Sequence, residues 1–199
     1  MDRRSFIRSS LSMAIAASLP GAHAFARSLL HTPTSVPSDI DAITGDGAEV
    51  TLARAAVQEL SDSLKGKLLL PGGEAYDEAR WLLQARYDKY PALVVQPTGA
   101  ADVQNAVTFA RENNLLLAVK CGGHSAAGKS SCDKGMQIDL SQLRNARVDR
   151  AAKTARIAGG SLLGELDHEA MAHGLVTTAG SVSHTGVGGL TLGLSLIHI

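Results

Sequence analysis

The sequence predicts a globular domain of the α/β or α+β class, because three kinds of signal occur together. Apolar runs at residues 92–95 and 115–119 predict two strands, and an apolar stripe between them predicts a helix that ends near Asn113. Further strands are expected at 136–140 and 154–158. A strand, a helix and a strand in succession build domains of these two classes. With 199 residues, of which 45% are hydrophobic and 19% charged, the chain is long enough to bury a core.

Residues 1–24 have the features of an export signal. A basic head that includes Arg3 and Arg4 precedes a short apolar run at 11–19, and Ala22-His23-Ala24 fits a cleavage site. The run is shorter than the roughly 20 residues that a membrane-spanning helix needs. The paired arginines resemble the bacterial twin-arginine signal, whose pathway carries folded proteins. We therefore expect export to the periplasm or beyond and no membrane contact after cleavage; an ordinary secretion signal is the alternative.

The segment 25–48 contains prolines and glycines and little periodicity, so it is interpreted as a linker or extended arm before a domain at 49–193. Apolar residues at helical spacing then predict a helix; they are Leu52, Ala56, Leu60 and Leu64. Residues 74–87 are expected to be a second, short helical or irregular piece. In the helix after residue 99 the apolar stripe consists of Val103, Ala106, Val107 and Ala110. Near the end of the domain, Ser161 can cap a helix that Gly174 ends.

The charges are balanced, with 19 Lys and Arg against 19 Asp and Glu. The chain therefore has no excess of basic residues that would indicate binding to nucleic acid or to a membrane surface. The two cysteines that follow the signal, Cys121 and Cys132, fit no zinc spacing, and no metal site is expected. An oxidising compartment would permit a disulfide between them, and one buried thiol with one loop thiol is the alternative.

Two Gly-rich segments, each expected to follow a strand, could bind a ligand: residues 120–125 and residues 180–193. Consecutive residues without a Cβ let several backbone N–H groups converge on one anion, so a pyrophosphate is a natural ligand. A pair of tight turns is the alternative. The dinucleotide pattern G-x-G-x-x-G fails in the second segment, because Thr191 stands where the third glycine is required.

A competing motif lies in the first segment, since Gly123 to Ser130 matches the P-loop pattern G-x-x-x-x-G-K-[ST]. Alone it would predict a nucleotidase. A P-loop must open a helix at its lysine, here Lys129, whereas this chain runs through Gly135 into the strand expected at 136–140. A P-loop nucleotidase and a non-catalytic exported domain therefore stay as alternative functions.

Taken together, the ordered motifs resemble the FAD-binding domain of the vanillyl-alcohol oxidase superfamily (PCMH type), and within it the berberine-bridge-enzyme-like group of FAD-linked oxidases. The resemblance runs from about Leu60 to Gly193. It is carried by the residues at 91–95, 102–107, 122–125, 138–140, 159–160, 173–175 and 185–193. It implies an α+β fold with two α+β subdomains that hold an extended FAD, followed in the family by a substrate domain.

The resemblance also implies site residues. The family's covalent flavin anchor maps onto His124, bonded to the 8α carbon of FAD, and further FAD contacts map onto Cys121, Gly122, Gly123, Ser125, Gly180, Thr185, Gly186, Gly188 and Gly189. The implied reaction is hydride transfer from a C–H bond of an alcohol, sugar or amine to FAD, with oxygen as the electron acceptor. The implied partners are thus a small-molecule substrate and oxygen.

Two departures from the family pattern matter. Some relatives add a second flavin link from a cysteine, and Val182 stands at that position, so a single link to His124 is expected. Residues 194–199 leave the pattern and are interpreted as foreign to the domain, with a short strand as the alternative, so His198 is not a candidate ligand. The FAD-binding domain is thus expected to be incomplete, with its catalytic residues unknown and in the missing half, and the 199-residue chain alone is expected to be inactive.

Overall fold

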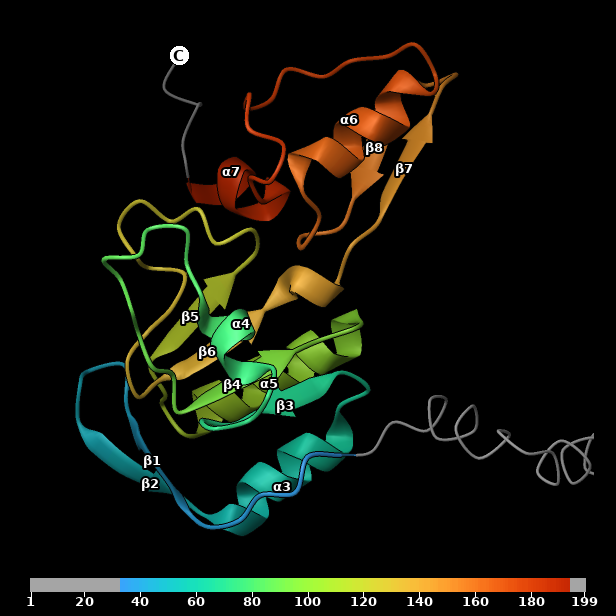
Figure 1. Ribbon diagram of the computed structural model, residues 1–199. Coiled ribbons are helices and arrows are strands. Elements are labelled where there is room, and N and C mark those ends of the chain that lie inside the picture. Colours follow the sequence, from blue (N-terminus) through green and yellow to red (C-terminus); the bar gives the residue numbers. More distant parts are fainter. Residues whose placement is uncertain (1–32, 194–199) are drawn as a thin grey trace, which may run out of the picture. The chain divides into compact units, whose positions relative to one another are not determined.

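The computed structural model describes residues 33–193 (Figure 1). The predicted export signal at 1–24, residues 25–32 and the predicted foreign tail at 194–199 lie outside the described residues. None of the helices within the described range is long and apolar enough to cross a membrane.

A four-stranded sheet forms the centre of the domain. Its order is β3 (Lys67–Leu69), β4 (Leu93–Gln96), β6 (Met136–Asp139) and β5 (Leu117–Lys120). The last three strands are parallel, and β3 runs antiparallel at one edge. Every residue of β4 and β6 is buried, as expected for central strands covered on both faces. The three parallel strands confirm the strands predicted at 92–95, 115–119 and 136–140.

The core has two layers, one on each face of the sheet. Strand β4 contributes to both layers, because successive side chains of a strand point to opposite faces of the sheet. Leu93 and Val95 pack in the larger cluster with residues of α3 (Arg54–Ser63) and α5 (Ala100–Glu112). Val94 packs on the other face against Tyr76 and Ala79 of α4 (Tyr76–Arg80). Helices therefore cover the sheet on both sides (Figure 1).

The buried stripe of α5 differs from the predicted one. Ala106 and Ala110 are buried as expected, but Val107 is 42% exposed and Asp102 is buried. The carboxylate of Asp102 accepts hydrogen bonds from the backbone N–H groups of Lys65, Gly66 and Thr98 at 2.9–3.0 Å. Burial raises the pKa of Asp102, but these hydrogen bonds together lower it by more than burial raises it. The pKa of Asp102 therefore lies below its ordinary value. The buried carboxylate thus sets the rotation of the helix, which apolar spacing alone misses.

The described part of the predicted linker is folded. Strand β1 (Ile40–Ile43) pairs antiparallel with β2 (Glu49–Leu52). Val36 and Ala42 are 1% and 2% exposed and belong to the main core. The Ile43 carbonyl accepts a 3.0 Å hydrogen bond from the Leu116 N–H. The structure corrects the linker interpretation from Pro33 onward, because two four-residue strands with mixed polarity leave too little periodicity to detect.

The second α+β part follows β6. A short 3₁₀ turn, η1 (Leu140–Gln142), leads to the antiparallel hairpin of β7 (Ala146–Asp149) and β8 (Thr154–Ile157), and α6 (Leu163–Met171) and α7 (Val187–Gly193) follow. The strand expected at 154–158 is confirmed. Gly174, with φ +66°, ends the α6 region as predicted. The whole is a mixed α+β fold.

The start of α6 differs from the prediction in one respect. The Leu162 N–H donates to the Glu165 carboxylate at 2.8 Å, so Leu162 and not Ser161 occupies the cap position. The Ser161 hydroxyl instead bonds both backbone groups of Asn145, accepting from its N–H at 2.9 Å and donating to its carbonyl at 3.1 Å. Ser161 therefore ties the beginning of this helix to the hairpin.

Candidate functional site

A cavity of about 590 Å³ lies between the two Gly-rich segments. One wall is the loop after β5, and the other is the turn before α7 together with α7 itself. The wall residues are Val119, Cys121 to Ala127, Lys129, Ser130, Leu140, Gly159, Thr185, Gly186, Gly188 to Leu190, Leu192 and Gly193. The structure thus brings together two segments that lie about 60 residues apart in the sequence.

All but one of the predicted site residues line this cavity: Cys121, Gly122, Gly123, His124, Ser125, Thr185, Gly186, Gly188 and Gly189. Gly180 is outside the lining, and the atoms nearest to a Cβ built there belong to Leu163 and Leu190. Sequence reasoning missed other lining residues: Val119, Ala126, Ala127, Lys129, Ser130, Leu140, Gly159, Leu190, Leu192 and Gly193. Most of these residues lie in or next to the two Gly-rich segments, and Leu140 and Gly159 lie in stretches that carry the family resemblance, so these positions were the available signal.

The two segments touch through their backbones. A Cβ on Gly122 would lie 2.4 Å from the backbone nitrogen of Gly186, and one on Gly186 would lie 2.4 Å from that of Gly122. A Cβ on Gly188 would lie 2.5 Å from the Gly159 carbonyl oxygen. No Cβ atom tolerates such distances. Packing by itself therefore requires glycine at these three positions, whether or not a ligand binds. By contrast, Gly189 has nothing within 4 Å of such a Cβ.

The second Gly-rich segment was expected to follow a strand, and this prediction is wrong. Its first residues are irregular, and α7 begins at Val187. A single bridge pairs Gly186 with Leu162, next to the start of α6. Val187 is buried and its N–H donates to the Ser161 carbonyl at 2.9 Å, which holds the first residue of α7 next to the start of α6.

A buried polar cluster fixes the strand ends from which the first loop departs. The Lys120 ammonium, at the end of β5, donates to the Ala79 carbonyl at 2.6 Å and lies 3.6 Å from the Asp139 carboxylate at the end of β6. Asp139 also accepts bonds from Gln96 and Ser141 at 2.8 and 2.9 Å. Because both charged groups are almost fully buried and paired, removing either would leave an uncompensated charge. The cluster therefore holds the base of the loop in one position.

Within the first loop, the backbone is left with free donors. No backbone N–H from Gly122 to Ala127 donates a hydrogen bond to another described residue, whereas the carbonyl groups of Gly123, Ser125 and Ala126 each accept one. Gly123 adopts φ +72°, a conformation that favours glycine. A run of unpaired N–H groups beside a cavity is an arrangement that binds anions.

His124 lies in the cavity wall in an unusual state. Its ring is 4.4 Å from the ring of His184, at an interplanar angle of 50°. Its Nε2 atom is buried and has no hydrogen-bond partner among the described residues. Burial, and secondarily the charge of His184, lower the pKa of His124 below its ordinary value. The lowered pKa favours the neutral imidazole, the form that has a nitrogen lone pair.

The P-loop interpretation lacks the helix that it needs. No helix begins at Lys129: the chain continues in turns from Ala126 to Gly135 and then enters β6. Gly128 has φ +67°, with the Tyr87 ring where a Cβ would stand. The phosphate-binding geometry of a P-loop is therefore absent from this segment.

Both cysteines are free thiols in this structure. Cys121 is half-buried in the cavity wall. Cys132 is buried, and burial raises its pKa to about 11. A thiol with so high a pKa is almost entirely protonated at neutral pH and is a poor nucleophile. Within residues 33–193 no group of three or more His, Cys, Asp or Glu side chains could hold a metal ion.

Comparison with known proteins defines the class. The sequence model of the family described as "FAD binding domain" matches residues 91–196, more than half of the chain. The chain therefore belongs to the family of this FAD-binding domain. It is 39% identical over 150 residues to an FAD-linked oxidoreductase of Dictyostelium discoideum, a match that covers 74% of this chain and 32% of the relative. It is 32% identical over 130 residues to (R)-6-hydroxynicotine oxidase of Paenarthrobacter nicotinovorans, covering 65% and 28%.

Solved structures agree with this assignment. The crystal structure of 6-hydroxy-D-nicotine oxidase from Arthrobacter nicotinovorans matches with a TM-score of 0.61 and 31% identity, covering 62% of this chain and 27% of that one. BBE-like 1 of Physcomitrella patens matches with a TM-score of 0.62 and 30% identity, covering 67% and 29%. The chain thus spans about a third or less of the length of these relatives.

The residues of the cavity fit an FAD. The free N–H groups of the first loop suit the pyrophosphate, and the apolar Val119, Leu140, Leu190 and Leu192 suit flat ring surfaces. Ser130 adds a buried hydroxyl oxygen that has no partner among the described residues. His124 supplies an unpartnered ring nitrogen in the same wall.

Proposed function

We propose that this chain is the FAD-holding part of an oxidase, and that His124 carries the flavin through a single covalent bond to its 8α carbon. The observation that carries the proposal is the environment of His124: its Nε2 atom is buried and unpartnered among the described residues, in the wall of a cavity between two Gly-rich segments, and burial lowers its pKa. A neutral imidazole is a competent nucleophile near pH 7, whereas a lysine would be largely protonated. The new N–C bond would replace one C–H bond of the 8α methyl group and the N–H bond of the imidazole; both hydrogens would leave as protons, and oxygen would accept the two electrons to give hydrogen peroxide.

Bound FAD would take hydride from a C–H bond of an alcohol, sugar or amine and return the electrons to oxygen as hydrogen peroxide. The described residues hold and orient the cofactor. The N–H groups of the first loop bind its phosphates, and the backbone contact between Gly122 and Gly186 keeps the two walls of the cavity at a fixed separation. The groups that bind and deprotonate the substrate are assigned to the part of the relatives that this chain does not cover.

The experiment is to express the chain with excess FAD, purify it and precipitate it in acid. We expect yellow protein with visible absorption, and flavin that stays with the precipitated polypeptide. The measurement is the flavin-to-protein ratio before and after precipitation. Colourless protein would reject FAD binding, whereas flavin that is bound but entirely released in acid would reject only the covalent bond. ATP hydrolysis by the same sample would favour the nucleotidase alternative.

We also propose export through the twin-arginine route, because Arg3 and Arg4 precede a short apolar run and Ala22-His23-Ala24. This route transports folded proteins, which suits a cofactor that is loaded before transport. Replacing both arginines with lysine should retain the protein in the cytoplasm, measured by fractionation and immunoblotting. Normal yield of the double-lysine form outside the inner membrane would contradict the twin-arginine assignment.

A further inference from the structure

The loop that carries His124 has little structure of its own. Between the end of β5 at Lys120 and the start of β6 at Met136, the described internal hydrogen bonds near His124 are those from Gly128 N–H to the Ser125 carbonyl at 3.1 Å and from Lys129 N–H to the Ser125 hydroxyl at 2.9 Å. Its shape therefore depends on other parts of the chain.

The segment at 81–90 supplies the missing contacts. The Leu83 N–H donates to the Gly123 carbonyl and the Arg86 guanidinium to the Ala126 carbonyl, both at 3.1 Å. The Lys89 ammonium donates to the carbonyls of Gly128 at 2.9 Å and Ser131 at 3.2 Å. These donors use only carbonyl oxygens of the loop, which leaves the N–H groups beside the cavity free.

Among these donors, Lys89 is the side chain that bonds two carbonyl groups of the loop. Its two acceptors flank Lys129 and Ser130, so one ammonium group closes the turn that follows His124. Lys89 is half-buried, and an ammonium group has three donors, enough for both carbonyls. The contact of Leu83 is a backbone bond, and Arg86 is exposed.

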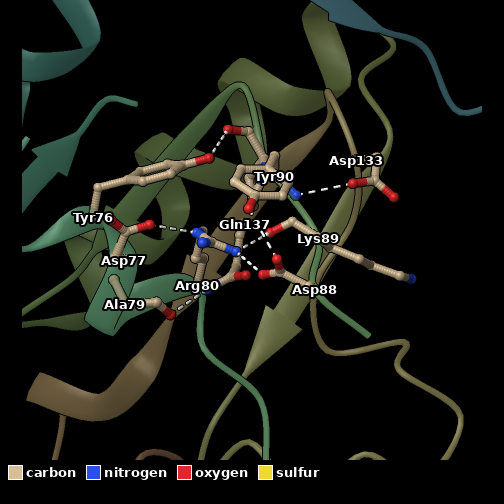
Figure 2. A network of polar contacts seen from close by, with 10 residues as sticks. Tyr76, Asp77, Ala79, Arg80, Asp88, Lys89, Tyr90, Asp133 and Gln137 are labelled. Carbon is tan, nitrogen blue, oxygen red and sulfur yellow. Dashed lines mark hydrogen bonds and ion pairs between the residues drawn. The ribbon is translucent and has the colours of Figure 1, made fainter. Parts of the chain in front are cut away.

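The backbone of Lys89 is held in place by Arg80, the last residue of α4. The Arg80 guanidinium donates to the Lys89 carbonyl at 3.1 Å, pairs with Asp77 at 2.7 Å and with Asp88, and lies 3.9 Å over the Tyr90 ring. Figure 2 shows the Lys89 side chain extending away from this cluster while its backbone stays within it. The backbone of Lys89 is thus fixed by α4 and its side chain reaches the loop.

We propose that Lys89 is a positioning residue for the flavin anchor: by bonding the Gly128 and Ser131 carbonyls, it sets the shape of the loop that presents His124. The proposal rests on the proposed function in that His124 is taken as the anchor. Lys89 does not line the cavity, so its effect on the flavin passes through the loop.

The test compares Lys89→Met, which keeps the length of the side chain and removes the donors, with Lys89→Arg, which keeps donors for both carbonyls. Lys67→Met, at an exposed position of β3, is the matched control. The first readout is the rate of trypsin cleavage after Lys129 in flavin-free chain, followed by mass spectrometry. The second is the fraction of chain that carries acid-stable flavin after incubation with FAD.

We expect Lys89→Met to speed cleavage at Lys129 at least about tenfold and to lower the rate of covalent flavin attachment by about 10- to 100-fold, because a displacement of about 1 Å is enough for such a loss. Lys89→Arg should restore most of both properties, and Lys67→Met should match the wild type. Equal cleavage in Lys89→Met and wild type would overturn the proposal, as would attachment at the wild-type rate. If the wild type itself attaches no flavin, the covalent bond of the proposed function is rejected, and the cleavage comparison still decides whether Lys89 shapes the loop.

Discussion

Replacing His124 with Ala is expected to release all of the flavin when the protein is denatured. His124 lies in the cavity wall with a lowered pKa and a ring nitrogen that has no partner among the described residues, a state that suits bond formation. Val182, which the sequence resemblance places at the position of a possible second link, has no nucleophile in its side chain. The measurement is flavin fluorescence of the protein band on a denaturing gel.

Two matched controls come from the same chain. Cys121→Ala removes the thiol that lines the cavity, and Cys132→Ala removes a buried thiol whose pKa of about 11 makes it unreactive. Both should keep their fluorescence on the gel. A fluorescent His124→Ala band would show that another residue bonds the flavin, and loss of fluorescence in Cys121→Ala would point to that cysteine.

Replacing Gly122 with Ala should destabilise the flavin-free domain strongly. The added Cβ would lie 2.4 Å from the Gly186 nitrogen and 2.8 Å from the His184 carbonyl oxygen, and both are backbone atoms that cannot rotate away. Overpacking of this kind costs about 1–3 kcal/mol of unfolding free energy, and more where the backbone must shift. We expect a clear fall in the midpoint of urea denaturation, followed by circular dichroism.

The matched control is Gly189→Ala, in the same cavity wall. A Cβ at Gly189 meets nothing within 4 Å, and the residue lies inside α7. Alanine in a helix interior is favoured over glycine by about 0.5–1 kcal/mol, so this variant should be as stable as the wild type or slightly more stable. Equal losses in both variants would show that the backbone contact between Gly122 and Gly186 does not determine stability.

The parallel strands and both Gly-rich walls of the cavity could be predicted from the sequence, because buried strands are continuous apolar runs and consecutive glycines mark close backbone approach. The strands β1, β2, β3 and β7 could not, because none of them lies in an apolar run as long as those at 92–95 and 115–119. The rotation of α5 was missed for a different reason: a buried Asp102 counts as polar in any apolar pattern, yet backbone donors from three other residues make it part of the core.

The candidate site shows the same limit. His124 and its glycine neighbours are visible as a motif, but its proximity to His184 depends on how two loops 60 residues apart meet. The contribution of Lys89 is equally hidden, because its bonds go to backbone carbonyls, which every residue possesses. Sequence patterns report side-chain types, so a contact made to the backbone leaves no trace in them.

The strand order of the central sheet has a consequence for how the domain folds. Strands β4 and β5 are consecutive parallel strands, yet they share no ladder; each pairs with β6, which enters between them. Neither strand finds its parallel neighbour until the chain has been synthesised through Asp139, and pairing across such sequence separation is slow because loop closure comes first. The loop with His124 joins β5 to β6, so it is closed in the same step that completes the sheet. Completion of the parallel sheet and closure of the loop that contains His124 therefore both depend on one event, the docking of β6.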